Sequence, residues 1–210
     1  MDLVTRRFMM WAYKLTILGQ EHVPQSGPAI LAANHESVLD PWFLATCTPR
    51  QVHYLAKAEL FRYPGIGAIL RGLGCVPVVR GADRGVAVDH AARLLDEGKF
   101  VGIFPQGTCL PLKRRPFRRG AARLALATGA PLVPLALIGT ELALQPRTHR
   151  IGFPSVTVIA GEPLDLDTTT VSNAATTELT ARLEAAVAEL RAPYDDPPDA
   201  RFAESRKELR

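Results

Sequence analysis

Short apolar runs alternate along this chain with segments of helical periodicity, and this alternation limits the possible folds more than any other feature. Helical patterns lie after Pro41 and near 59–73, 84–97, 119–128 and 172–191. Strands that alternate with helices favour a mostly parallel sheet with helices on both faces. The sequence therefore predicts an α/β fold. The apolar runs, each long enough for one buried strand, lie at 29–33, 52–56, 75–79, 100–104, 132–138 and 155–160.

The length of 210 residues suits a single domain with a substantial core. We assign this domain to residues 14–192. The preceding residues, 1–13, are predicted to form an amphipathic helix. The last residues, 193–210, are rich in proline and charge, and such a composition predicts a mobile tail.

The helix predicted over residues 2–13 has two possible locations. Its apolar side chains stand beside Arg6 and Arg7, and Trp11 is among them. Basic residues and tryptophan are typical of helices that lie at the interface of an anionic bilayer. The alternative is a terminal helix that packs on its own domain.

Three further properties bear on the compartment. No run of 18 apolar residues occurs, and no signal peptide is recognisable, so neither a membrane span nor secretion is predicted. The three cysteines are far apart and form no C-x-x-C pair, which indicates a reducing, cytoplasmic compartment and no metal site. The net charge of +4 is compatible with a phosphorylated ligand or an anionic membrane.

A candidate general base lies directly after the first long apolar run. His35 and Asp40 are five residues apart in Asn-His-Glu-Ser-Val-Leu-Asp, where a strand is expected to end. Ligand sites of open α/β sheets gather at such strand ends. A carboxylate bound to one imidazole nitrogen fixes the tautomer and leaves the other nitrogen to act as a base. A capping or core histidine is the alternative.

A second candidate segment, Phe104–Thr108, follows the run at 100–104. Its Pro-Gln-Gly sequence predicts a tight turn whose backbone N–H groups an anion can approach. A basic stretch without acidic residues comes next, which indicates an anion site, although a solvated face is the simpler alternative. Nucleic acid is disfavoured because Phe117 is the only aromatic residue within the stretch and no nucleic-acid-binding motif occurs. The basic residues are Lys113, Arg114, Arg115, Arg118, Arg119 and Arg123.

In their order, these segments resemble the glycerolipid acyltransferases, the 1-acylglycerol-3-phosphate acyltransferase family. Residues 34–40 are similar to its Asn-His-x4-Asp block, and residues 74–80 are similar to its second block, which ends in an arginine, here Arg80. Residues 104–108 resemble its Phe-Pro-Glu-Gly-Thr block, and residues 116–123 resemble the segment after it. Residues 133–137 resemble the fourth block. The resemblance covers about residues 15–165.

The resemblance implies a glycerolipid acyltransferase-like fold and an O-acyltransferase activity. The acyl group would pass from acyl-CoA or acyl-carrier protein, a co-substrate rather than a cofactor, to a lysophosphatidate-like acceptor. His35 would be the base and Asp40 its partner, and no metal is implied. Backbone N–H groups near Gly107 are candidates to stabilise the negative oxygen of the tetrahedral intermediate. The implied location is the inner face of the cell membrane. The substrate-binding residues would be Arg80, Gln106, Gly107, Thr108, Lys113 and Arg118.

Two departures from the family pattern keep alternatives open. Gln106 stands where the family has glutamate, and Cys109 stands where an arginine usually follows the threonine. One alternative is therefore the same chemistry on another acceptor, such as glycerol 3-phosphate, a different lysophospholipid or a lipidated natural product. A non-catalytic lipid-binding relative is the other, although the intact His35 and Asp40 argue against it.

Overall fold

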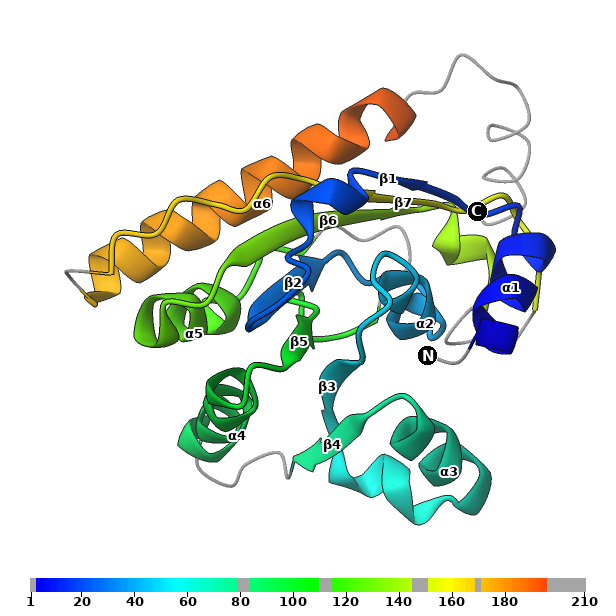
Figure 1. The fold of residues 1–210 in the computed structure, drawn as a ribbon, viewed down its shortest axis with the longest axis horizontal. Helices are drawn as coiled ribbons and strands as arrows, with labels where there is room; N and C mark the ends of the chain where they lie inside the picture. The colour runs from blue at the N-terminus through cyan, green and yellow to red at the C-terminus, as the bar shows by residue number, and fades with distance from the viewer. Residues whose placement is uncertain (1–2, 79–83, 110–114, 145–150, 169–170, 196–210) are drawn as a thin grey trace.

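A computed structural model describes residues 3–78, 84–109, 115–144, 151–168 and 171–195 of the chain. Its helices and strands form one α/β unit (Figure 1). Within these residues, 3₁₀ helices cover Gln20–His22, Ala58–Arg62 and Thr140–Leu142. The α-helices are α1 (Leu3–Ala12), α2 (Asp40–Ala45), α3 (Pro64–Gly72), α4 (Arg84–Asp96), α5 (Gly120–Thr128) and α6 (Asn173–Asp195). The strands are β1 (Thr16–Leu18), β2 (Ala29–Ala33), β3 (Val52–Lys57), β4 (Cys75–Val78), β5 (Phe100–Ile103), β6 (Leu132–Ile138) and β7 (Thr157–Ala160).

The seven strands form one sheet in the order β1-β7-β6-β2-β5-β3-β4. From β6 to β4 every neighbouring pair is parallel, whereas β7 runs antiparallel to β6. The predicted fold class, an α/β domain with a mostly parallel sheet, is therefore confirmed. Because β2 lies between β5 and β6, the segments that follow these three strands meet at one edge of the sheet.

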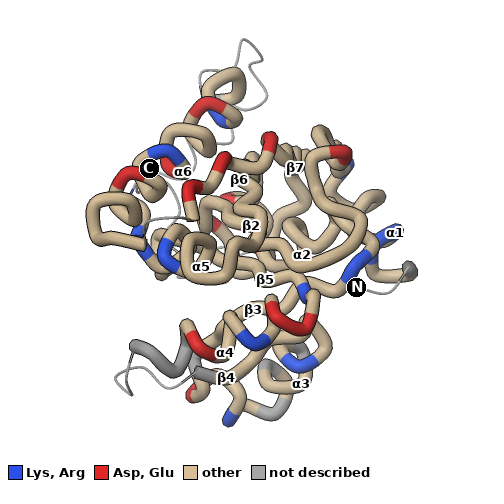
Figure 2. Tube along the Cα trace, turned by 60° about the vertical axis from the view of Figure 1, so that its left-hand side comes forward, with Lys and Arg blue, Asp and Glu red and all other residues tan. Residues whose placement is uncertain are grey.

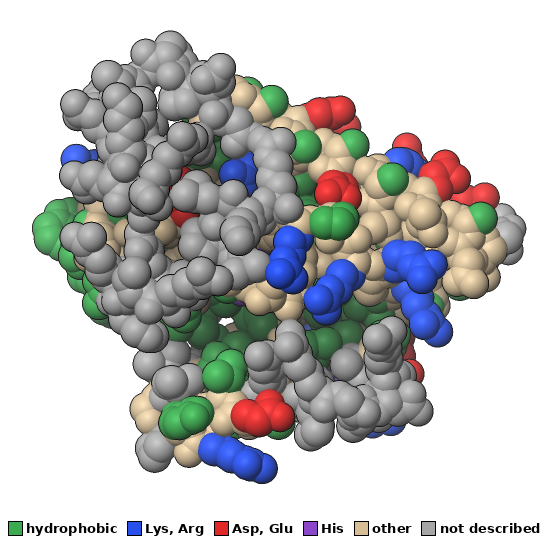
Figure 3. Space-filling view, turned by 180° about the vertical axis from the view of Figure 1, so that it is seen from behind, with side chains coloured by type: hydrophobic (Ala, Val, Ile, Leu, Met, Phe, Trp, Pro, Cys, Tyr) green, Lys and Arg blue, Asp and Glu red, His purple; other side chains and the backbone are tan. Residues whose placement is uncertain are grey.

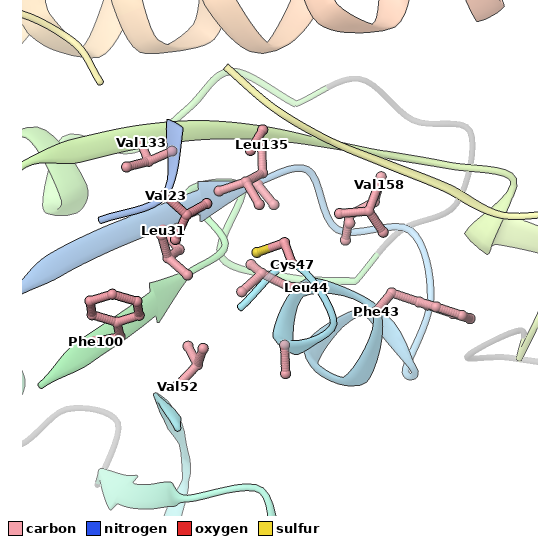
Figure 4. Packing of buried hydrophobic residues seen from close by; sticks show 14 of the residues in the cluster. Val23, Leu31, Phe43, Leu44, Cys47, Val52, Phe100, Val133, Leu135 and Val158 are labelled. Atoms are coloured by element: carbon pink, nitrogen blue, oxygen red, sulfur yellow. The ribbon is translucent and has the colours of Figure 1, made fainter. Parts of the chain in front are cut away.

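Helices cover both faces of the sheet, as the sequence predicts. Alternate residues of β2 point to opposite faces, so that Leu31 contributes to one core and Ile30 to the other. The core on the Leu31 side includes residues of α1 and α2, and Figure 4 shows Leu44 and Cys47 packed there near Leu135. The core on the Ile30 side is closed by α4, α5 and α6. Both faces of β2 are fully buried, which accounts for its uninterrupted apolar sequence.

Several predicted boundaries differ from the structure. The helix expected at 59–73 is divided into a 3₁₀ turn and α3, and the division falls at Tyr63-Pro64, because a residue before proline disfavours helical backbone angles. The last helix was expected to end near 191 but continues to Asp195. Pro193 lies in its final turn, where a proline removes only one backbone hydrogen bond. Strand β1 was not predicted, because its three residues give too short a pattern.

Arg50 joins the amino ends of three neighbouring strands, at the edge of the sheet opposite the candidate site. Its guanidinium donates to the carbonyl oxygens of Gly27 (2.5 Å) and Gly98 (2.7 Å), which precede β2 and β5. It also lies 4.1 Å above the ring of Phe100. Arg50 itself precedes β3, so one side chain fixes the starts of β2, β5 and β3.

Candidate active site

Asn34 holds the end of β2 against β6. Its side-chain amide donates to the carbonyl oxygen of Leu137 and accepts from the N–H of the same residue, both at 2.8 Å. The side chain thereby makes the pair of bonds that a backbone peptide makes in a β-ladder. The loop that follows begins from a fixed point, and this loop carries His35.

Asp40 turns the loop back on itself. Its Oδ2 accepts hydrogen bonds from the backbone N–H groups of Glu36 (2.6 Å) and Ser37 (2.8 Å), and it contacts His35 Nδ1 at 2.8 Å. The carboxylate is fully buried, whereas the imidazole is partly exposed. With Nδ1 held by Asp40, Nε2 is the nitrogen that can exchange a proton with a ligand. The predicted His35–Asp40 pair therefore exists in the structure.

Gln106 connects the turn after β5 to the same loop. Its Oε1 accepts a hydrogen bond from the backbone N–H of His35 at 2.6 Å, and the residue is buried. A glutamine carbonyl oxygen performs this role as a glutamate oxygen would. The structure thus brings Gln106, which the family resemblance implies as a substrate-binding residue, to the backbone of His35.

Two aromatic rings, those of Phe104 and Tyr54, form a stack against one face of the His35 imidazole. The ring of Phe104 is stacked on His35 with centroids 4.3 Å apart, and Tyr54 is stacked on Phe104 at 6.1 Å. Gly102 makes room for this arrangement, because a Cβ atom there would lie 2.2 Å from the Tyr54 ring. The Tyr54 hydroxyl donates to the carbonyl oxygen of Pro41 at 2.7 Å, at the start of α2. The stack therefore links β3, β5 and the loop that carries the base.

The Phe104–Thr108 turn forms as predicted and is covered by an arginine. The N–H of Gly107 donates to the carbonyl oxygen of Phe104 at 2.9 Å, so this N–H closes the turn. Gly107 has a φ of +70°, and a Cβ atom there would lie 2.8 Å from the guanidinium carbon of Arg118. Arg118 in turn donates its backbone N–H to Pro105 at 2.9 Å. Glycine is thus favoured by the backbone angle, and a side chain at this position would displace the guanidinium of Arg118.

The basic residues that the structure describes near this turn are exposed. These are Arg115, Arg118, Arg119 and Arg123. Figure 3 shows a row of Lys and Arg side chains along one side of a hollow in which apolar side chains are visible. Thr108 and Cys109 are partly buried beside the turn. Arg80 and Lys113, two other predicted contacts to the substrate, lie outside the described residues.

None of the cysteine thiols has the environment of a nucleophile. Burial raises the pKa of Cys47 and of Cys109 to about 12, and that of Cys75 to about 11. The charges of Asp40 and Glu36 add to the effect of burial in raising the pKa of Cys109. A thiol with such a pKa stays protonated near neutrality and is a poor nucleophile. Among the described residues, no group of His, Cys, Asp and Glu side chains is arranged to hold a metal ion.

Sequence reasoning missed several residues that shape the site. Asn34, Ser37 and Tyr54 act through contacts across the fold, which spacing along the chain does not reveal. Ser37, for example, donates its hydroxyl to Leu144 at 3.1 Å, 107 positions away. Only the contact between Gly102 and Tyr54 could have been suspected from the sequence, because a glycine inside an otherwise apolar strand often marks a close approach of another group.

The fold and the site together define a class: an α/β protein with a carboxylate-oriented histidine at the carboxyl edge of a parallel sheet. The acyltransferase family model matches residues 14–138, which contain the whole loop and the turn after β5. A 1-acyl-sn-glycerol-3-phosphate acyltransferase of Bacillus subtilis is 34% identical over 151 residues, or 70% of this chain and 72% of that protein. A chloroplastic enzyme of the same name from Arabidopsis thaliana is 34% identical over 158 residues, covering 72% of this chain but 44% of its own length.

Among solved structures, the 1-acyl-sn-glycerophosphate acyltransferase PlsC of Thermotoga maritima has the same fold. It superposes with a TM-score of 0.77 at 24% identity, over 93% of this chain and 80% of that one. The chain belongs to the acyltransferase family. The resemblance inferred from the sequence is confirmed, and so is the expected class of enzyme, since the named relatives are O-acyltransferases. None of the helices within the described residues has the length and apolar character that crossing a bilayer requires.

Proposed function

We propose that the protein transfers a fatty acyl group from a thioester donor to the free hydroxyl of a lysophosphatidate-like glycerolipid. The observation that carries this proposal is the His35–Asp40 pair, in which a fully buried carboxylate holds Nδ1 at 2.8 Å. The names of the relatives supply the substrate class. The donor is acyl-CoA or an acyl-carrier protein, because a thioester is already activated and transfer from it needs no further energy source.

His35 Nε2 takes the proton of the acceptor hydroxyl as its oxygen attacks the thioester carbonyl carbon. The new C–O bond gives a tetrahedral intermediate with a negative oxygen. When this intermediate collapses, the C–S bond breaks and the leaving thiolate takes the proton back from the imidazolium. Asp40 stabilises the imidazolium through Nδ1. A positioned base of this kind typically contributes a factor of about 10²–10⁴ to the rate.

Arg118 is proposed to bind the acceptor phosphate, together with Arg80 and Lys113. Its guanidinium lies against Gly107, on the turn that Gln106 ties to His35. A phosphate held there would place the rest of the acceptor beside the base. One guanidinium group can donate two parallel hydrogen bonds to two oxygens of a phosphate, which orients the ligand as well as attracting it.

Helix α1 is proposed to lie on the anionic inner face of the cell membrane. Val4, Phe8 and Trp11 share one face of the helix, and their side chains are 78%, 52% and 79% exposed. Arg7 is exposed on the same helix, which carries no acidic residue. Figure 2 shows basic residues on α1, at one end of the molecule. Apolar side chains beside basic ones match the interface of an anionic bilayer.

An acyl-transfer assay over a panel of acceptors tests the proposed function. Wild-type protein, acyl-CoA and acyl-carrier protein would be combined with lysophosphatidate, glycerol 3-phosphate and other lysophospholipids. We expect the fastest turnover with lysophosphatidate, and a loss of at least about 100-fold in His35→Ala without loss of the fold. A folded His35→Ala protein that kept more than about a tenth of the wild-type rate would contradict the role of the base.

The same panel decides between the proposal and its alternatives. Cys109 in place of the usual arginine removes one cation near the turn, and this observation favours an acceptor with fewer anionic groups as the second candidate. Faster turnover of such an acceptor would identify it as the substrate. Binding of lysophosphatidate without turnover of any acceptor would indicate a non-catalytic relative.

A further inference from the structure

Glu36 lies between the proposed base and its partner in the sequence, yet its side chain contacts the last helix. Its Oε1 is 2.6 Å from Nη1 of Arg191 in α6, a residue 155 positions away. The backbone N–H of Glu36 donates to Asp40 Oδ2, also at 2.6 Å. Residue 36 is therefore bonded to the carboxylate of the site through its backbone and to α6 through its side chain.

The surroundings of this ion pair are buried and rich in carboxyl groups. Glu36, Asp40 and Glu141 are all buried, and the Arg191 side chain is largely covered. The pKa of Glu36 is raised to about 7, chiefly by burial and also by the charges of Glu141 and Asp40, whereas Arg191 lowers it. The guanidinium of Arg191 thus compensates the negative charge of a cluster that includes the partner of the proposed base.

Arg191 is carried by a well-anchored element. Helix α6 has 23 residues, and Leu179, Leu183 and Val187 on one of its faces belong to the core beneath the sheet. Arg191 lies one helical turn beyond Val187. Its guanidinium is therefore presented from a rigid support and not from a loop.

We propose that Arg191 is a positioning residue, which holds Glu36 toward α6 and so keeps the loop from His35 to Asp40 in the shape that binds the imidazole. The proposal rests on the proposed function of His35. Without Arg191, the pKa of Glu36 would rise further, because its buried charge would lose the cation beside it, and the carboxyl group would be protonated throughout the neutral range. Its neutral carboxyl would then be an O–H donor close to Asp40, whose Oδ1 has no hydrogen-bond partner among the described residues. Such a donor would compete with His35 for the carboxylate.

Two substitutions and a matched control test this role. Arg191→Met removes the cation, and Arg191→Lys keeps the charge. Arg182→Met is the control, because Arg182 also ties α6 to a neighbouring segment, through the carbonyl oxygen of Asp165 at 3.1 Å, but is not bonded to the loop. We expect kcat to fall about 10- to 100-fold in Arg191→Met with KM changed less than about threefold, since the base is misplaced while the binding residues remain. Arg191→Lys should recover most of the rate, and Arg182→Met should stay within about twofold of wild type.

A second measurement does not depend on turnover. The Nδ1 proton of His35, bound to Asp40, should give a downfield NMR signal, assigned by its loss in Asp40→Asn. We expect this signal to be shifted or lost in folded Arg191→Met and retained in Arg191→Lys and Arg182→Met. An unchanged signal together with an unchanged kcat in Arg191→Met would overturn the proposal. If wild-type protein turned over no acceptor, the proposed function would fail, while the signal would still decide whether Arg191 orders the loop.

The double variant Glu36→Met/Arg191→Met covers the case in which Arg191→Met does not fold. Methionine at position 36 removes both the buried charge that requires a cation and the donor that would compete for Asp40. The double variant should therefore fold and show the His35 signal. A double variant that folds but lacks the signal would contradict the electrostatic role assigned to Arg191.

Discussion

At the scale of single residues, the site depends on which atoms accept hydrogen bonds from the loop around His35. Asp40 Oδ2 accepts from two backbone N–H groups as well as contacting the imidazole, and Gln106 Oε1 accepts from the N–H of His35 itself. Both acceptors are buried. Gln106 provides its oxygen without adding a charge next to Asp40 and Glu36. The substitution of the family glutamate therefore preserves geometry and reduces the local negative charge.

The effect of restoring that charge can be predicted. Gln106→Glu should lower stability and rate, because it places a further buried carboxylate near Asp40 and Glu36. Cys109→Arg should partly offset this, because Asp40 and Glu36 raise the pKa of Cys109 and should for the same reason attract a cation at position 109. We expect a favourable coupling of about 1 kcal/mol or more between the two substitutions in a double-mutant cycle, measured by urea unfolding and by kcat/KM. Strictly additive effects would mean that the two departures from the family pattern are unrelated.

At the scale of elements, we predict that Arg50 stabilises the amino ends of β2, β5 and β3. Arg50→Ala removes two hydrogen bonds from a charged donor and a contact with the Phe100 ring, and should lower the free energy of unfolding by about 2–3 kcal/mol. Because these contacts lie at the amino ends of the strands, kcat should stay nearly unchanged. Arg71→Ala is a suitable control, since its exposed guanidinium lies 5.9 Å above the Phe61 ring. Equal stability of the two variants in urea would contradict this role of Arg50.

A second prediction at this scale concerns the binding of helix α1 to a membrane. Phe8→Asp with Trp11→Asp should reduce sedimentation with anionic phospholipid vesicles at least about tenfold, because apolar insertion and attraction of the basic residues act together there. Val171→Asp is the matched control. Val171 is also an exposed apolar residue, but it lies beside the start of α6, at the opposite end of the molecule from α1 (Figure 1). Similar losses in both proteins would point to general hydrophobicity, and no loss in either would point to another membrane-binding surface.

Most elements of the fold could be predicted because burial leaves a direct pattern in the sequence. Strand β2 is apolar on both faces, and its predicted bounds, 29–33, agree with the structure. Pairing with distant partners leaves no such pattern. The antiparallel β7 and the short β1 beside it are determined by contacts with β6 and with each other, so neither the direction of the one nor the existence of the other could be predicted.

The same distinction applies to the site. His35, Asp40 and Gln106 were found because they lie in short segments at the ends of apolar runs. The contact between Glu36 and Arg191 could not be found in this way, because the two residues are separated by most of the domain and α6 looks like an ordinary amphipathic helix. An arginine on such a helix is usually a solvated residue, and only the packing of α6 shows otherwise.

At the scale of the whole molecule, Glu36 couples stability to pH. Its pKa is about 7 in the folded protein against an ordinary value of 4.5, so the folded state binds this proton more tightly than the unfolded chain. The corresponding stability is fully present below about pH 4.5 and is lost as the pH rises to about 7. Glu36→Gln should remove this loss. Between pH 4.5 and 8, unfolding by urea should show the variant gaining about 3 kcal/mol relative to wild type.

The control for this measurement is the exposed Glu162, where a change to glutamine should leave the dependence of stability on pH as it is in the wild type. Parallel stability curves for wild type and Glu36→Gln would show that Glu36 is not the group responsible.

The two bonds between Asn34 and Leu137 also have a consequence for the timing of local opening. The amide proton of Leu137 is bound to a side chain that begins the loop of the base, and this bond is buried. Deuterium from the solvent can replace that proton only when the hydrogen bond to Asn34 breaks, and the loop then loses its fixed starting point. The exchange rate of the Leu137 amide would therefore report how often the loop that carries His35 unfolds locally while the rest of the protein remains folded.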